Sequence, residues 1–300
     1  MTIDLCGVKL KNPLIAASGT FGFGREYGEF YDISSWGAIA VKGLTNEPRE
    51  GNPPHRIAET ASGVLNSVGL QNPGIDAFLR DELPRLARAG TAVIANVAGS
   101  TAEDYAEAVR KLSGAPVDIV ELNISCPNVK RGGAQFGARP ESAAEITSAV
   151  RKVCDHPLMV KLSPNVSDIT EIARAVSGAG ADAISLINTV TGMAIDAKTR
   201  TPVLANVTGG LSGPAIKPVA LRMVWQTSRA VSIPVVGMGG IMTGEDAAEF
   251  LIAGANAVMI GTANMIDPFA GPRILRELEN FMDENGVPDV GSLVGTLKTG

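Results

Sequence analysis

The chain has 300 residues, of which 45% are hydrophobic and 19% charged, a composition typical of one large α/β domain or two small ones. Its formal net charge of −5 argues against nucleic acid as a partner, because surfaces that follow phosphates are basic. No export signal opens the chain, and no apolar run approaches the ~18 residues of a membrane span. We therefore expect a cytoplasmic protein that does not enter a membrane.

Short apolar, β-branched runs recur along the chain and predict eight strands. In chain order they cover residues 13–18, 37–43, 91–97, 117–125, 157–164, 181–189, 233–240 and 255–262. Amphipathic segments predict helices at 101–112, 141–153, 168–180 and 244–255. Apolar strands joined by crossover helices indicate a parallel sheet buried on both faces. Eight such units favour a (β/α)8 TIM barrel over an open doubly wound sheet.

Two connections are too long to be plain helices. Residues 44–79 and 190–214 follow the second and sixth predicted strands, so we expect both to lie over the C-terminal mouth of the barrel. Residues 1–11 predict a hairpin that plugs the opposite end. No linker, repeat or low-complexity tract interrupts the chain. We therefore predict a single domain over residues 1–300, with residues 284–300 as a C-terminal tail.

Polar side chains and glycines stand at the C-terminal ends of these apolar strands. They are Ser18, Lys42, Asn96, Asn123, Lys161, Asn188, Thr189, Gly239, Gly240, Gly261 and Thr262. A solvated loop edge is the ordinary explanation for one such residue, because burying an amide or an ammonium without partners costs several kcal/mol. Five strands that end in this way favour a shared ligand cavity.

The last two predicted strands end in glycine-rich turns. GMGG (237–240) and IGTA (260–263) each precede a predicted helix, which places backbone N–H groups at two neighbouring helix N-termini. Barrels commonly bind a phosphate group at this position. The alternative is that the glycines serve only tight turns.

Lys42 and Lys161 suggest a ligand that carries negative charge or acquires it during a reaction. A reduced flavin does so at its N1/O2 edge, where a lysine stabilises it electrostatically. The rival interpretation is that Lys161 is a Schiff-base nucleophile, as in a lyase.

Cysteine is used three times, as Cys6, Cys126 and Cys154, without the spacing of a disulfide framework or a metal site. Cys126 follows a strand end and precedes a proline, so we expect its thiol at the mouth of the barrel, where a thiolate can act as general base. Lys130 and Arg131 are candidates to favour the thiolate, and residues 128–137 have the composition of a mobile lid. A buried, inert cysteine is the usual alternative and fits Cys6 and Cys154 better.

Motifs over most of the chain together resemble one family. They are AVKG (40–43), NSVGLQNPG (66–74), ELNISCPNVKRGG (121–133), VKLSPN (160–165), NT (188–189), GGLSGPAIKP (209–218), GMGGI (237–241) and IGTA (260–263). The chain resembles the catalytic subunits of class 1B dihydroorotate dehydrogenases from about Leu5 to Glu279. Cysteine within the NISCPN motif is similar to the cytosolic class 1 enzymes, since the membrane-linked class has serine there.

The resemblance implies an FMN-dependent enzyme of de novo pyrimidine biosynthesis that oxidises (S)-dihydroorotate to orotate. Cys126 would take the proton from C5 while a hydride leaves C6 for N5 of FMN. The implied cofactor-binding residues are Ser18, Lys42, Gly43, Asn96, Asn123, Lys161, Ile187, Gly213, Gly239, Gly240, Gly261 and Thr262. The implied substrate-binding residues are Lys42, Asn66, Ser67, Val68, Gly69, Leu70, Asn123, Asn188 and Thr189.

The same resemblance implies a partner chain. In class 1B enzymes a subunit with FAD and a [2Fe–2S] cluster passes the electrons to NAD+, in a heterotetramer of two of each chain around a homodimer of the catalytic subunit. Three alternatives stay open at this point: a related flavin-dependent dihydropyrimidine dehydrogenase, a Schiff-base lyase at Lys161, and a scaffold that binds FMN or phosphate without catalysis.

Overall fold

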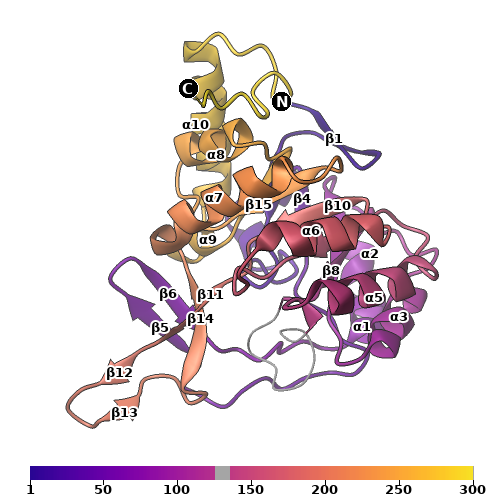
Figure 1. Cartoon of the computed structure of the whole chain (residues 1–300), viewed down its shortest axis with the longest axis vertical. Helices are drawn as coiled ribbons and strands as arrows, with labels where there is room; N and C mark the ends of the chain where they lie inside the picture. Colours follow the sequence, from indigo (N-terminus) through magenta and orange to yellow (C-terminus); the bar gives the residue numbers. More distant parts are fainter. Residues whose placement is uncertain (126–135, 300) are drawn as a thin grey trace.

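Eight parallel strands close into a barrel in the computed structural model, which describes residues 1–125 and 136–299 (Figure 1). In chain order they are β3 (Leu14–Ala16), β4 (Ala38–Ala40), β7 (Ala92–Val97), β8 (Ile119–Asn123), β9 (Leu158–Lys161), β10 (Ala183–Leu186), β15 (Val235–Met238) and β16 (Ala257–Ile260). Each strand pairs in parallel with the next, and β16 pairs with β3 to close the ring. The predicted TIM barrel is confirmed.

Successive side chains of each strand point alternately into and out of the barrel. The inner apolar cluster includes Ile15, Ile94, Ile119 and Met159, and it lies below the C-terminal ends of the strands. Outward-facing side chains pack against the surrounding helices in a second, larger core. The apolar strand sequences are therefore explained by burial on both faces.

Helices between the strands cover the outside of the barrel (Figure 1). They are α1 (Ile75–Ala77) with the π-helical turn Phe78–Glu82 and α2 (Leu83–Leu86), α3 (Ala102–Lys111), α5 (Pro140–Arg151), α6 (Ile169–Gly178), α7 (Lys217–Ser228), α8 (Gly244–Ile252), α9 (Thr262–Ile266) and α10 (Ala270–Glu284). Short 3-10 turns lie at Tyr27–Glu29, Ile33–Ser35 and Pro214–Ile216. Capping boxes begin α3 and α8, with Thr101 and Thr243 each accepting a backbone N–H three residues on.

An antiparallel hairpin closes the N-terminal end of the barrel. Strands β1 (Ile3–Leu5) and β2 (Val8–Leu10) pair as predicted, and Leu5 and Leu10 are buried against the inner cluster. The hairpin and the C-terminus lie at one end of the molecule in Figure 1. The hairpin therefore covers the inner cluster at this end of the barrel.

The two long connections meet above the C-terminal mouth and form a sheet of their own. Strands β5 (Ile57–Thr60) and β6 (Gly63–Asn66) come from the first connection, and β11 (Val190–Met193) and β14 (Thr208–Ser212) from the second, in the order β11-β14-β6-β5. Between β11 and β14, β12 (Ile195–Asp196) pairs with β13 (Thr201–Pro202) in an arm that projects away from the barrel (Figure 1). The sequence predicted the position of these connections but not their pairing.

Residues 285–299 contain no helix, yet they pack on the barrel. Val290 and Leu293 are buried in the outer core, and the Gly295 N–H donates to the Leu251 carbonyl at 3.0 Å. In the described part of the chain, no helix has the length and apolarity needed to cross a bilayer.

Helix α10 approaches the barrel closely because its second residue, Gly271, is a glycine. A Cβ at Gly271 would lie 2.0 Å from Cζ2 of the buried Trp36, whereas a Cβ at Gly178 in α6 would meet nothing within 4 Å. We expect Gly271→Ala to lower the free energy of unfolding by about 1–3 kcal/mol through overpacking. The matched control Gly178→Ala should raise it by about 0.5 kcal/mol. Urea unfolding measures both, and equal effects would contradict the packing shown here.

Candidate active site

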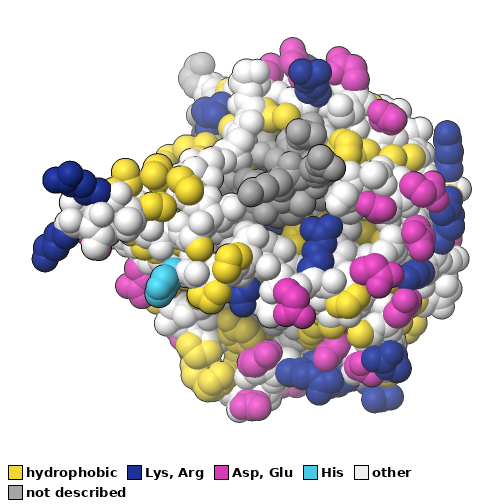
Figure 2. All heavy atoms as spheres, turned by 90° about the horizontal axis from the view of Figure 1, so that it is seen from below, with side chains coloured by type: hydrophobic (Ala, Val, Ile, Leu, Met, Phe, Trp, Pro, Cys, Tyr) yellow, Lys and Arg dark blue, Asp and Glu magenta, His cyan; other side chains and the backbone are white. Residues whose placement is uncertain are grey.

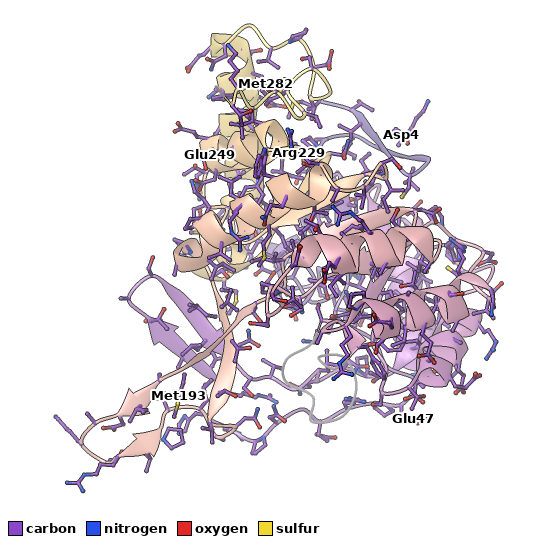
Figure 3. All side chains as sticks on the ribbon, in the orientation of Figure 1. Asp4, Glu47, Met193, Arg229, Glu249 and Met282 are labelled. Carbon is purple, nitrogen blue, oxygen red and sulfur yellow. The ribbon has the colours of Figure 1, made fainter. Side chains whose placement is uncertain are left out.

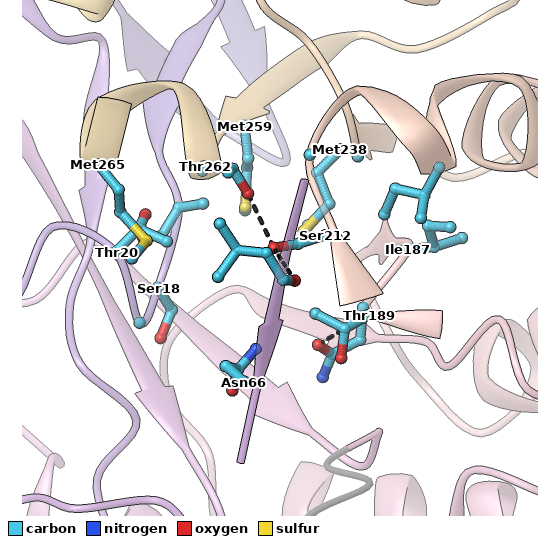
Figure 4. Close-up of a pocket in the computed structure, with 18 of the residues that line it drawn as sticks. Ser18, Thr20, Asn66, Ile187, Thr189, Ser212, Met238, Met259, Thr262 and Met265 are labelled. Atoms are coloured by element: carbon cyan, nitrogen blue, oxygen red, sulfur yellow. Dashed lines mark hydrogen bonds between the residues drawn. The ribbon is translucent and has the colours of Figure 1, made fainter. Parts of the chain in front are cut away.

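A cavity of about 190 Å³ opens at the C-terminal mouth of the barrel (Figure 4). Side chains from the ends of the barrel strands form its floor. The two long connections, which contain β5–β6 and β11–β14, form part of its wall. Residues from distant parts of the chain meet here: Ser18 follows β3, Asn66 ends β6, and Thr262 follows β16. The predicted shared cavity exists.

Most of the residues predicted to bind a cofactor or substrate line this cavity. They are Ser18, Lys42, Gly43, Asn66, Val68, Gly69, Leu70, Asn96, Asn123, Lys161, Ile187, Asn188, Thr189, Gly213, Gly239, Gly240, Gly261 and Thr262. Two predicted residues stand apart. Ser67 is fully buried outside the lining, where it accepts a hydrogen bond from the Asn52 Nδ2, and Cys126 lies outside the described residues, as does most of the predicted lid.

Lys161 is almost fully buried in the cavity floor. It ends β9, where the strand register places it beside Asn123 of β8 and Ser185 of β10. Within residues 1–125 and 136–299, its ammonium has no hydrogen-bond or ion-pair partner. A buried ammonium without a protein partner is costly, so the cavity suits a ligand with an electron-rich edge near Lys161.

Three asparagine side chains are connected across the floor, two of them through the Ser125 hydroxyl. Asn188 donates from Nδ2 to the Ser125 Oγ at 2.8 Å, and the Ser125 Oγ donates to the Asn123 Oδ1 at 2.9 Å. The Asn123 Nδ2 lies 3.5 Å from the Asn96 Oδ1, which is a long contact. The Asn188 Oδ1 accepts from the Thr189 backbone N–H at 2.8 Å. These hydrogen bonds fix which side of each amide carries the oxygen and which carries the nitrogen.

A carboxylate that the sequence analysis did not single out lies under this network. Glu121 is fully buried in β8 and accepts from the Asn96 Nδ2 at 2.5 Å and from the Ser185 Oγ at 2.6 Å. Glu121 and Asn123 are two positions apart and share the inner face of the strand. That spacing in VDIVELNIS was the signal that could have identified Glu121.

The glycine turns are arranged differently from the prediction at one of the two helices. The Met242 and Thr243 N–H groups donate to the Asp246 carboxylate, and the Gly244 N–H donates to the Glu277 Oε2. The N-terminus of α8 is therefore occupied by its own cap, and the prediction that it offers bare N–H groups was wrong. The turn before it, Gly239 and Gly240, does line the cavity.

Close backbone packing explains why glycine stands in this turn. Gly240 has φ of +80°, and a Cβ there would lie 2.8 Å from the Lys217 nitrogen and 2.9 Å from the Gly213 oxygen. Across the cavity, the Thr262 Oγ1 donates to the Ser212 Oγ at 2.9 Å and joins the end of β16 to β14 (Figure 4). The turn after β15 thus packs through Gly240 against Gly213, which follows β14.

Several lining residues were not predicted from the sequence. They include Thr20, Ile57, Val64, Ser212, Met238, Met259 and Met265. Met238 and Met259 could have been found from their inner positions on β15 and β16, since they also belong to the inner cluster. The residues of the two long connections could not, because their place depends on pairing between distant segments.

With the geometry described, comparison with known proteins identifies the family. The model of the family described as dihydroorotate dehydrogenase matches residues 1–282. The chain belongs to the dihydroorotate dehydrogenase family. The resemblance seen in the sequence motifs is thereby confirmed.

Curated members of this family are similar to the chain over nearly its whole length. Proteins from Alkaliphilus metalliredigens (strain QYMF) and Alkaliphilus oremlandii (strain OhILAs) are 57% and 56% identical over 297 residues, which cover 99% of this chain and 98% of each relative. A protein from Geotalea uraniireducens (strain Rf4) is 55% identical, and the matched region covers 100% of this chain and 98% of that protein. All three are named dihydroorotate dehydrogenase B (NAD(+)), catalytic subunit.

A solved structure of the family has the same fold. The crystal structure of a dihydroorotate dehydrogenase from Eimeria tenella in complex with ferulenol superposes with a TM-score of 0.84 at 22% identity, covering 98% of this chain and 88% of that one. At this identity the likeness supports the barrel fold alone.

Burial distinguishes two of the three cysteines of this dihydroorotate dehydrogenase family member. Burial raises the pKa of the Cys6 thiol to about 12, with smaller contributions from the Asp182 and Asp4 carboxylates, and burial also raises the pKa of Cys154. A raised thiol pKa means less thiolate at a given pH, and at pH 8 roughly one Cys6 thiol in 10⁴ is ionised.

We therefore expect iodoacetamide at pH 8 to spare Cys6 and Cys154 in the native protein and to alkylate Cys126 first. Mass spectrometry of peptides gives the rate at each cysteine, and urea-unfolded protein, in which all three should react alike, is the control. Alkylation of Cys6 at the same rate in native and unfolded protein would contradict this assignment.

Proposed function

We propose that this chain oxidises (S)-dihydroorotate to orotate with FMN, as the catalytic subunit of an NAD-linked dihydroorotate dehydrogenase of de novo pyrimidine biosynthesis. The observation that carries the proposal is the cavity itself: amides and a buried lysine from separate strands converge on one space in a chain of this family. The names of relatives above 50% identity support the NAD-linked type.

The cavity floor fits a flavin. Lys161 has no partner among the described residues and would stabilise the N1/O2 edge of the isoalloxazine, which becomes negative on reduction. The glycine turns at Gly239–Gly240 and Gly261, with Gly213, would hold the phosphate group with backbone N–H groups. Because α8 is capped by its own side chains, the turns themselves and not that helix terminus would supply these donors.

The amides fit the substrate. The dihydroorotate ring alternates N–H and C=O groups, and an asparagine side chain offers both an acceptor and two donors to such an edge. Asn66, Asn123 and Asn188 line the same cavity, with Thr189 and Lys42 beside them. An analogue that left these buried amides unpaired would bind poorly.

Cys126 is the proposed general base. It takes the proton from C5 of dihydroorotate while a hydride leaves C6, so that the C5–C6 double bond of orotate forms. FMN, when bound, supplies the two-electron acceptor for that hydride at its N5. The residues of the chain hold the ring edge, exclude water and accept the proton.

The electrons then leave through a partner. We propose a subunit with FAD and a [2Fe–2S] cluster that reduces NAD+, in a cytoplasmic heterotetramer of two of each chain around a homodimer of this one. The term catalytic subunit in the names of the relatives supports a partner. Exposed apolar side chains at and beside the projecting arm support a protein contact: Ile195 lies in β12, and Met193 ends β11 (Figure 3). Figure 2 shows hydrophobic side chains on this projection.

Anaerobic reduction tests the proposed reaction. Dihydroorotate should bleach the yellow FMN-loaded protein, whereas dihydrouracil should not, because it lacks the carboxylate. Stopped-flow absorbance of the flavin measures both rates. Faster bleaching by dihydrouracil would indicate a dihydropyrimidine dehydrogenase, and a protein that cannot be loaded with FMN would end the proposal.

Replacement of the base tests the mechanism. Cys126→Ser should slow bleaching by dihydroorotate about 100-fold or more, since a hydroxyl is a much weaker base at neutral pH, while the dissociation constant of FMN stays unchanged. Cys6→Ser, at the opposite end of the barrel, is the matched control and should bleach at the native rate. Native bleaching by the Cys126 variant would remove this residue from the mechanism.

A further inference from the structure

Glu121 is a buried carboxylate to which the proposed reaction gives no part. It lies inside the barrel, between Ile119 and Asn123 on the inner face of β8, and its side chain is fully buried. A buried carboxylate is expensive, and an apolar side chain of similar volume at such a position is often neutral or stabilising. Stability alone therefore does not explain a glutamate here.

The contacts of Glu121 fix the orientation of one amide. A carboxylate oxygen only accepts, so the Asn96 amide must turn its Nδ2 toward Glu121. The strand register makes this contact direct, because Asn96 and Glu121 are paired across β7 and β8. The Asn96 Oδ1 then faces the Asn123 Nδ2. In the reverse orientation the Asn96 Oδ1 would face the Glu121 carboxylate, and the Asn96 Nδ2 would face the Asn123 Nδ2.

The other amides are oriented from the backbone. The Ser125 N–H reaches the Asn123 Oδ1 at 3.3 Å, and the Thr189 N–H reaches the Asn188 Oδ1 at 2.8 Å. Asn96 has no such backbone donor to its side chain among the described residues. The orientation of Asn96 therefore depends on Glu121.

We propose that Glu121 is a positioning residue: its carboxylate holds the Asn96 amide in the single orientation that the bound cofactor requires. This inference rests on the proposed function. Ser185, the second donor to Glu121, satisfies the carboxylate but does not line the cavity, so it acts on stability and not on the ligand.

Two variants separate these roles. Glu121→Met removes the acceptor at similar volume, so the chain should bind FMN about tenfold more weakly, the loss that one net hydrogen bond produces. Its unfolding midpoint should fall as well, because the Asn96 and Ser185 donors lose their acceptor. Ser185→Ala should lower the midpoint while FMN binds within about threefold of native. Flavin fluorescence titration and thermal unfolding of the full-length chain measure both quantities.

Glu121→Gln should restore binding. Its Oε1 can accept from Asn96 while its Nε2 donates to the Ser185 hydroxyl, which can also accept. Native FMN affinity in Glu121→Met, or a loss in Glu121→Gln as large as in Glu121→Met, would overturn the inference.

Exchanging the amide and the carboxylate between positions 96 and 121 tests the positioning role even if Glu121→Met fails to fold. Asn96→Asp alone sets two carboxylates face to face and should weaken FMN binding, whereas Asn96→Asp with Glu121→Gln restores a donor between them and should recover most of the affinity. No recovery would count against positioning. The proposed reaction is judged separately, because native protein that binds FMN but is not bleached by dihydroorotate would overturn the reaction and leave these FMN comparisons valid.

Discussion

Alternation of side chains along closed strands is the constraint on which the site depends. In each barrel strand every second residue points inward, so a polar residue at the C-terminal end of one strand meets its counterparts from the others. Lower inner positions such as Ile94 and Met159 fill the barrel and, with the hairpin, seal it below. Polar side chains at the C-terminal ends of the strands consequently face the cavity. Closure of the barrel therefore brings residues that are far apart in the chain together in one site.

Much of this could be predicted from the sequence because it is local. An apolar run identifies a strand, and the residue at its end identifies a position on the mouth, as Lys161 and Asn123 illustrate. The cap of α8 was also readable, since Thr243 stands three residues before Asp246, a spacing typical of a capping box. The glycines before it are typical of a phosphate-binding turn, so two patterns overlap in this segment. Glu121 is harder to predict, because it lies within its strand and not at the end.

The remaining features are non-local. Strand β6 meets β14 across more than a hundred residues of chain, and no local sequence pattern predicts which strand edges will pair. Leu70 has a positive φ of 57°, which a bulky side chain rarely adopts and which the sequence does not predict. Ser67 shows the limit of reading a motif as a list of contacts. It belongs to the same segment as its lining neighbours, yet it faces Asn52 and is buried.

The electrostatics of the floor follow from how Glu121 is satisfied. Both carboxylate oxygens are engaged by neutral donors, the Asn96 amide and the Ser185 hydroxyl. Lys161 lies on the adjacent strand, and the structure records no ion pair between the two residues. Had the carboxylate paired with this lysine, the ammonium would have been neutralised within the protein. Because neutral groups satisfy Glu121, the charge of Lys161 is not neutralised by that carboxylate, and in a site of low dielectric it would stabilise the electron-rich edge of the proposed flavin. The same hydrogen bonds that orient Asn96 thus leave the cation available.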